Sequence, residues 1–108
     1  MKKILLTLVS IGVGIAVASA ADAKENWENH CAKCHGSDGK GKTKMGQKLK
    51  VKDYTDPKVQ EKLKDEEMIK ITKEGVKEGD KTLMKGFADE LSDAEIKALV
   101  EYIRKFKK

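Results

Sequence analysis

The apolar positions of this chain recur most regularly near its C-terminus, where they have the spacing of one face of an α-helix. Ser92 and Glu95 have the spacing of a capping box, and Leu91 with Ile96 has that of a hydrophobic staple. The sequence therefore predicts a final helix that begins just after Ser92. Its apolar stripe consists of Ile96, Leu99, Val100, Ile103 and Phe106.

Two shorter helices are predicted in the middle of the chain. Asp56 and Pro57 pair a capping carboxylate with a proline at the first helical position, which predicts a short helix ending near Lys64. Asp65 is expected to cap the next helix. No alternation of polar and apolar residues predicts a β-strand, so residues 79–89 are expected to form a loop. The inner face of the helix after Asp65 is expected to comprise Met68, Ile69, Thr72 and Val76.

An apolar leader occupies the start of the chain. Lys2 and Lys3 precede an apolar stretch that ends in the small-residue sequence Ala18-Ser19-Ala20. Residues 1–20 are therefore interpreted as a secretory signal peptide, cleaved after Ala20 or, alternatively, after Ala23. An uncleaved membrane anchor is the competing interpretation, because the apolar stretch is borderline against the roughly 20 residues of a spanning helix.

The mature chain, residues 21–108, is long enough for one small domain. A first helix is predicted over about Ala23 to Cys34, followed by an irregular loop of glycines and lysines from Gly36 to Gly46. The whole chain has only five aromatic residues and one proline. Because so small a domain buries little surface, it often depends on a metal, a disulfide or a cofactor for its stability.

Cys31, Cys34 and His35 form the pattern C-x-x-C-H, which is typical of covalent attachment of a c-type haem. Each thiol can add across one vinyl group of the haem to give a thioether. The imidazole of His35 then lies under the porphyrin and can ligate the iron, and its other N–H is expected to be donated to a carbonyl. Export agrees with this interpretation, because bacteria attach such haems outside the cytoplasmic membrane.

Three other interpretations of the same residues stay open. The cysteines could form a structural disulfide, which an oxidising compartment would favour. They could be a thioredoxin-like redox pair, although that chemistry is expected near a βαβ pattern. A zinc site would need a fourth ligand, and only His30, immediately beside Cys31, remains to supply it.

The mature chain resembles the class I c-type cytochromes, the small soluble bacterial kind with one haem. The resemblance lies in the C-x-x-C-H motif with an aromatic residue, Trp27, one turn before it, in a methionine before the last helix, and in the pattern of residues 91–104. It implies an all-α cytochrome c fold in which the first and last helices cross, with Trp27 meeting Tyr102. Short helices and loops would wrap around one covalent haem c.

The sixth position of the iron has few candidate ligands. His30 adjoins the attachment motif, and Met68 belongs to a helical face. Met45 and Met84 lie in predicted loops, and Met84 is the preferred distal ligand because the family places its methionine just before the last helix. Packing of Met84 in the core and ligation by Met45 stay as alternatives. At high pH a lysine amine could also ligate, and the candidates are Lys81 and Lys85.

Charge indicates a class of partner. Loss of Lys2 and Lys3 with the leader lowers the formal net charge from +5 to +3. Lysines crowd the region of the attachment motif, so docking onto an acidic redox protein is expected, although a merely solvated surface is an equal alternative. Nucleic-acid binding is disfavoured, since the basic residues are not interleaved with aromatic ones. The lysines concerned are Lys33, Lys40, Lys42, Lys44, Lys48 and Lys50.

These observations predict a periplasmic one-electron carrier with His35 and Met84 as axial ligands, rather than an enzyme. The mature protein is expected to be a monomer, free of the membrane, with redox proteins as partners. The first alternative is a five-coordinate haem protein in which Met84 binds weakly or not at all, acting as a small-ligand sensor or a peroxidase. The second is a disulfide-stapled binding module without haem.

Overall fold

The structure, a computed structural model, describes residues 20–108. The predicted signal peptide lies outside the described residues except for Ala20, so its cleavage stays a prediction. Within residues 20–108 no helix combines the length and the apolar character needed to cross a membrane.

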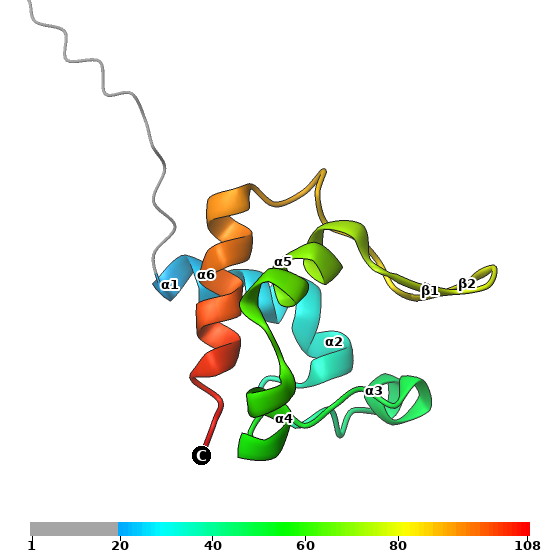
Figure 1. Ribbon diagram of the computed structural model, residues 1–108, viewed down its shortest axis with the longest axis horizontal. Helices are drawn as coiled ribbons and strands as arrows, with labels where there is room; N and C mark the ends of the chain where they lie inside the picture. The colour runs from blue at the N-terminus through cyan, green and yellow to red at the C-terminus, as the bar shows by residue number, and fades with distance from the viewer. Residues whose placement is uncertain (1–19) are drawn as a thin grey trace, which may run out of the picture.

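A continuous helical run ends in the C-x-x-C-H motif (Figure 1). Its middle turn is π-helical, since the amide of Ala32 donates to the carbonyl of Trp27, five residues earlier. Trp27 and Cys31, four positions apart, are both buried on the inner side of this turn. The run starts before the predicted Ala23, and it comprises α1 (Ala20–Asn26), the π-helical turn (Trp27–Cys31) and α2 (Ala32–His35).

The expected loop from Gly36 to Gly46 was partly wrong, because its end belongs to a helix, α3 (Lys44–Leu49). Thr43 caps this helix, since its hydroxyl oxygen accepts a hydrogen bond from the amide of Gly46. A glycine inside a helix lowers its intrinsic stability, which is why the composition favoured a loop. Tertiary packing decides otherwise, because Gly46 lies directly against the carbonyl of Cys34.

The two middle helices are α4 (Pro57–Lys62) and α5 (Asp65–Glu74). Asp56 caps α4 as predicted, and its carboxylate accepts from the amide of Lys58 at 2.9 Å. Asp65 does not cap α5: the residue before the helix is Lys64, and the carboxylate of Asp65 binds Arg104 instead.

An antiparallel hairpin, β1 (Val76–Glu78) and β2 (Lys81–Met84), replaces the predicted loop and corrects the all-α expectation. The hairpin projects from the helical body (Figure 1). Its strands pair only with each other and most of their residues are exposed, so no buried face imposes an alternating sequence. This explains why the pattern of residues does not predict it. Val76, expected on the inner face of α5, pairs with Met84 in the hairpin.

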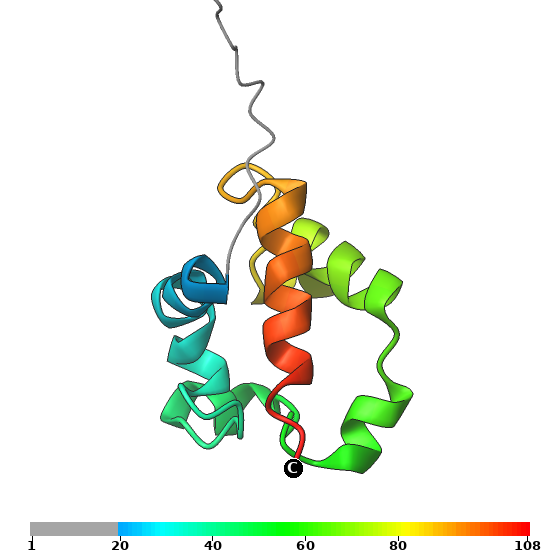
Figure 2. The same ribbon diagram turned by 90° about the vertical axis from the view of Figure 1, so that its left-hand side faces the viewer.

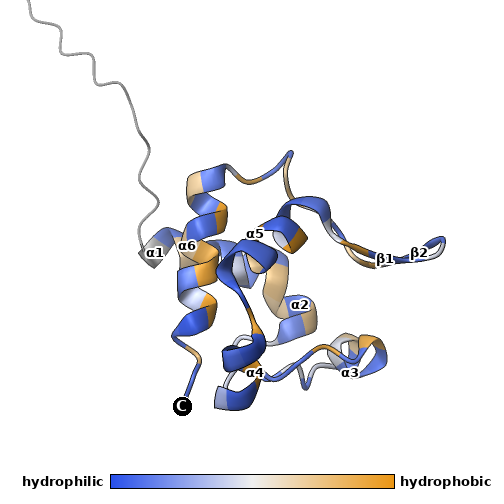
Figure 3. Cartoon of the chain, in the orientation of Figure 1, coloured by the Kyte–Doolittle hydropathy of each residue, from blue (hydrophilic) through white to orange (hydrophobic). Residues whose placement is uncertain are grey.

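The last helix, α6 (Asp93–Arg104), confirms the prediction most closely. Both hydrogen bonds of the capping box are present, from the amide of Glu95 to Ser92 and from the amide of Ser92 to Glu95. Figure 2 shows α6 between α1 on one side and α5 on the other. Its apolar residues line the side that faces the middle of the molecule (Figure 3). The core cluster comprises Trp27, Cys31, Met68, Phe87, Leu91, Ile96, Leu99, Val100 and Ile103.

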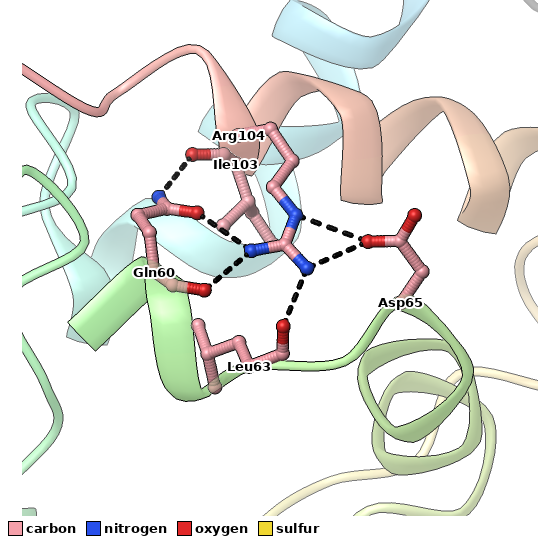
Figure 4. A network of polar contacts seen from close by, with 5 residues as sticks. All are labelled: Gln60, Leu63, Asp65, Ile103 and Arg104. Atoms are coloured by element: carbon pink, nitrogen blue, oxygen red, sulfur yellow. Dashed lines mark hydrogen bonds and ion pairs between the residues drawn. The ribbon is translucent and has the colours of Figure 1, made fainter. Parts of the chain in front are cut away.

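The end of α6 is tied to the loop between α4 and α5 by a polar network (Figure 4). The guanidinium of Arg104 donates to the carbonyls of Gln60 and Leu63 and to the carboxylate of Asp65. The side-chain amide of Gln60, a buried residue, donates to the carbonyls of Tyr54 and Ile103. Arg104 therefore supplies additional donors to carbonyls at and just after the end of α4.

Candidate haem site

The two cysteines of the motif are free thiols. Cys31 is buried, at 7% exposure, whereas Cys34 is half-buried. Burial, with a smaller contribution from Cys34, raises the pKa of Cys31 to about 12. The two cysteines lie one helical turn apart on the same helical run. The raised pKa means that Cys31 is a neutral thiol at pH 7.

His35 follows on α2 and contacts two aromatic rings. Its ring lies 5.3 Å from that of Tyr54 at an interplanar angle of 21°, and 5.6 Å from that of Trp27. Burial lowers the pKa of His35, so the imidazole is neutral and its lone pair is available to a metal. Among the described residues its buried Nδ1 atom has no hydrogen-bond partner, and the expected carbonyl acceptor is not found there.

The backbone of the motif is held by three neighbouring groups. The indole N–H of Trp27 donates to the carbonyl of Gly36 at 2.9 Å. The hydroxyl of Thr43 donates to the carbonyl of Cys34 at 2.6 Å, and the amide of Gly41 donates to that of His35 at 2.8 Å. The sequence analysis missed Thr43. A threonine three residues before a glycine is too weak a signal to show that its hydroxyl supports the motif.

These residues fit a covalently attached haem. Cys31 and Cys34 offer two unpaired thiols for thioether bonds, and His35 offers a neutral imidazole whose buried Nδ1 has no hydrogen-bond partner among the described residues. The rival interpretations find less support. The cysteines are not paired as a disulfide. No cluster of three or more His, Cys, Asp or Glu side chains suited to a metal ion occurs in the described part of the chain.

The three methionines of residues 20–108 lie in different surroundings. Met84, the last residue of β2, is half-buried and packs against the core cluster. Met45 lies on α3 with 38% of its surface exposed. Met68 is a member of the core cluster itself, as its place on a helical face predicted. The structure thus brings Met84, but not Met45, against the cluster that contains Cys31.

The expected contact between the first and last helices is present. The rings of Trp27 and Tyr102 lie 5.9 Å apart, and Phe106 packs on the same indole at 5.1 Å. A helical fold in which an N-terminal C-x-x-C-H helix meets the last helix in this way defines the class of small c-type cytochromes. A protein of this class carries covalently bound haem c and transfers electrons.

Comparison with known proteins gives the family. Residues 18–103 match the family model described as cytochrome C oxidase, cbb3-type, subunit III, and the chain belongs to this family. A solved structure of the KustC0563 c-type cytochrome is 36% identical over 80% of this chain and 98% of its own, with a TM-score of 0.72. A mutant of that cytochrome is 36% identical over 80% and 99%, with a TM-score of 0.70. No curated protein matches the chain significantly.

Proposed function

We propose that this cytochrome is a periplasmic one-electron carrier whose haem iron is ligated by His35 and Met84. The haem, when bound, supplies an iron that takes up one electron and returns it. Cys31 and Cys34 hold the haem by thioether bonds. The chain is a carrier and not an enzyme, because strong ligands on both faces leave no position open for a substrate.

The observation that carries the proposal is the placement of the two ligand residues around one buried cluster. His35 contacts the indole of Trp27, a member of that cluster, and reaches it from the motif helix. Met84 packs against the same cluster and reaches it from the hairpin, a separate element. Two ligands that come from separate elements to one apolar centre suit the two faces of a flat group.

The ligand types determine the redox behaviour. A thioether is a soft ligand that stabilises the reduced iron, and an apolar pocket disfavours the additional charge of the oxidised form. Both effects raise the reduction potential. Ligands that stay bound in both oxidation states also keep structural change small, which favours rapid electron transfer.

Partner docking is proposed for the lysine-rich face beside the motif. Residues 40–52 contain six lysines and no acidic residue. Within the described structure none of these six side chains forms an ion pair, and α3, which lies in this segment, borders α2. A positive surface that is not neutralised internally attracts an acidic redox protein, with association that slows as salt rises.

The test is substitution of Met84 by alanine, with Met45→Ala as the matched control. Met84→Ala is expected to lower the potential, to abolish the weak far-red band of iron–sulfur ligation and to let carbon monoxide bind, while the haem stays covalently attached. Met45→Ala should leave all three properties unchanged. The opposite pattern would transfer the ligand role to Met45. Ready binding of carbon monoxide by the unsubstituted protein would support the five-coordinate sensor or peroxidase instead.

A further inference from the structure

The loop that follows Met84 folds back on itself through an exposed ion pair. The ammonium group of Lys85 lies 2.5 Å from the carboxylate of Glu90 and 5.6 Å from the centre of the Phe87 ring. The amides of Glu90 and Leu91 both donate to the carbonyl of Phe87, so the backbone turns back towards Lys85. The hydrogen bond from Lys85 is the main cause of a lowered pKa for Glu90, which keeps that carboxylate ionised.

The same loop also contacts the helix that carries the motif. The rings of His30 and Phe87 lie 5.3 Å apart, and Nδ1 of His30 is 3.9 Å from the other oxygen of Glu90. His30 directly precedes Cys31, and Lys85 directly follows Met84. Glu90 therefore contacts both His30, which precedes Cys31, and Lys85, which follows Met84.

Apart from the ion pair of Lys85, the backbone of residues 85–91 is restrained mainly on the side that faces α5. The only proline of the chain is Pro57, so no ring restricts residues 85–91. On the inner side the amides of Phe87 and Ala88 donate to the carbonyls of Thr72 and Lys73. These bonds hold the middle of the loop, and the backbone of residues 84–86 packs closely against that of residues 73–75. On the solvent-exposed side, the side chain of Lys85 adds the ion pair with Glu90.

We propose that Lys85 and Glu90 are positioning residues that keep Met84 on the iron by closing this loop against the motif helix. The inference rests on the proposed ligation by Met84. Breaking the pair lets the segment after Met84 move, so the sulfur leaves the iron more often, without any change to the haem-binding residues themselves. The pair is exposed, so its effect is modest and sensitive to salt.

The experiment is a double-mutant cycle on the holoprotein with Lys85→Gln, Glu90→Gln and the double variant. The readout is the rate at which carbon monoxide binds the reduced iron, which is limited by departure of the methionine. Each single variant is expected to raise this rate about two- to five-fold, the range of an exposed ion pair. The double variant should be no faster than the faster single variant, because both remove one interaction.

A pair elsewhere supplies the matched control. Lys73 and Asp93 form an ion pair of 2.8 Å at comparable exposure, between α5 and α6. Lys73→Gln and Asp93→Asn should leave the rate of carbon monoxide binding unchanged, even where they lower the melting temperature. Raising the salt concentration should speed binding in the unsubstituted protein towards the rate of Glu90→Gln, and should change that variant little.

The possible failures can be told apart. If the unsubstituted protein lacks the iron–sulfur band, ligation by Met84 is wrong and the proposed function fails with it. If that band is present and is lost in Met84→Ala, but Lys85→Gln leaves the rate unchanged or the two substitutions add, the positioning role of the pair is overturned while ligation by Met84 stands.

Discussion

The two sides of this cytochrome that carry the proposed axial ligands are held by different forces. The motif side, residues 20–43 together with α6, is fixed by buried side chains: Trp27 and Leu99 are each 1% exposed and Ile96 is 0%. The hairpin side, residues 75–91, has exposed strands, an exposed ion pair and two buried apolar residues, Phe87 and Leu91. Burial of apolar surface contributes far more free energy than an exposed ion pair.

The motif side and the hairpin side also have different roles in holding the haem. On the motif side the haem is attached permanently, so the structure around Cys31 and His35 needs only to stay folded. On the hairpin side Met84, the proposed ligand, has to stay close to the iron without a covalent bond to the haem. Local openings therefore begin on the hairpin side, and the properties that depend on Met84 are the ones that small surface changes can adjust.

Loss of the haem is the most severe test of this contrast. The variant with both Cys31→Ala and Cys34→Ala cannot attach haem, and we expect it to lose cooperative melting and most of its helical signal, because so small a domain has little other core. Circular dichroism of the purified variant measures both. Met84→Ala, which keeps its haem, is the control and should still melt cooperatively. A native helical spectrum with cooperative melting in the variant without haem would show that the polypeptide core suffices.

Removal of Trp27 tests the motif side. Trp27→Ala deletes a ring that packs on His35, Tyr102 and Phe106, and it should lower the free energy of unfolding by about 3–5 kcal/mol. Urea unfolding of the holoprotein measures the loss. Trp27→Phe keeps an aromatic ring but removes the N–H that donates to Gly36, so it should cost distinctly less. Equal stability of Trp27→Ala and the unsubstituted protein would contradict burial as the main force on this side.

Substitution of two glycines, Gly75 and Gly79, tests how closely the hairpin side holds Met84. Gly75 has a φ of 82° and a ψ of −175°, a conformation reserved almost entirely for glycine, and an added Cβ would run into the carbonyl of Met84. Gly75→Ala should therefore lower stability by about 3 kcal/mol and speed the binding of carbon monoxide. In the control Gly79→Ala the φ is 61° but the added Cβ meets nothing within 4 Å, so only about 1 kcal/mol is lost and ligation is kept. Identical behaviour of the two variants would mean that the Met84 loop tolerates displacement.

The smallest effect concerns the capping box of α6. The amide of Ser92, followed by the side chain of Asn26, lowers the pKa of Glu95 below that of an unfolded chain. Ionised Glu95 thus stabilises the fold above the unfolded pKa, and this contribution is lost as the pH falls through the lower folded value. Glu95→Gln should reduce stability at pH 7 and match the unsubstituted protein in acid below the folded pKa of Glu95, without changing carbon monoxide binding. If the stability difference persisted in acid, the charge of Glu95 would not be its cause.

The parts of the fold that sequence predicted are those whose signals are local. The start of α6 follows from Ser92 and Glu95, and that of α4 from Asp56 and Pro57, because each cap binds amides a few residues away. The chemistry of Cys31, Cys34 and His35 is predicted for the same reason, since all three lie within five positions.

The wrong predictions, for α3, the hairpin and the cap of α5, have a common physical origin in contacts that no local pattern encodes. Helix α3 forms although it contains Gly46, because that glycine fits against the carbonyl of Cys34. The hairpin forms after Gly75 and Gly79 turn the chain, with no buried face that would mark its strands. Asp65 was expected to cap α5, but it binds Arg104, 39 positions away. No pattern within a short window of sequence contains that information.

The crossing of α1 and α6 has a consequence for the timing of maturation. Asn26 and Glu95, whose side chains are bonded across it, are 69 positions apart in the chain. A polypeptide is synthesised from its N-terminus, so the two thiols emerge long before the helix that completes their surroundings. During that interval the sulfur of Cys31 is still accessible, whereas the finished fold leaves the residue only 7% exposed. If Cys31 and Cys34 attach the haem as proposed, this order of elements leaves Cys31 accessible until α6 has packed against α1.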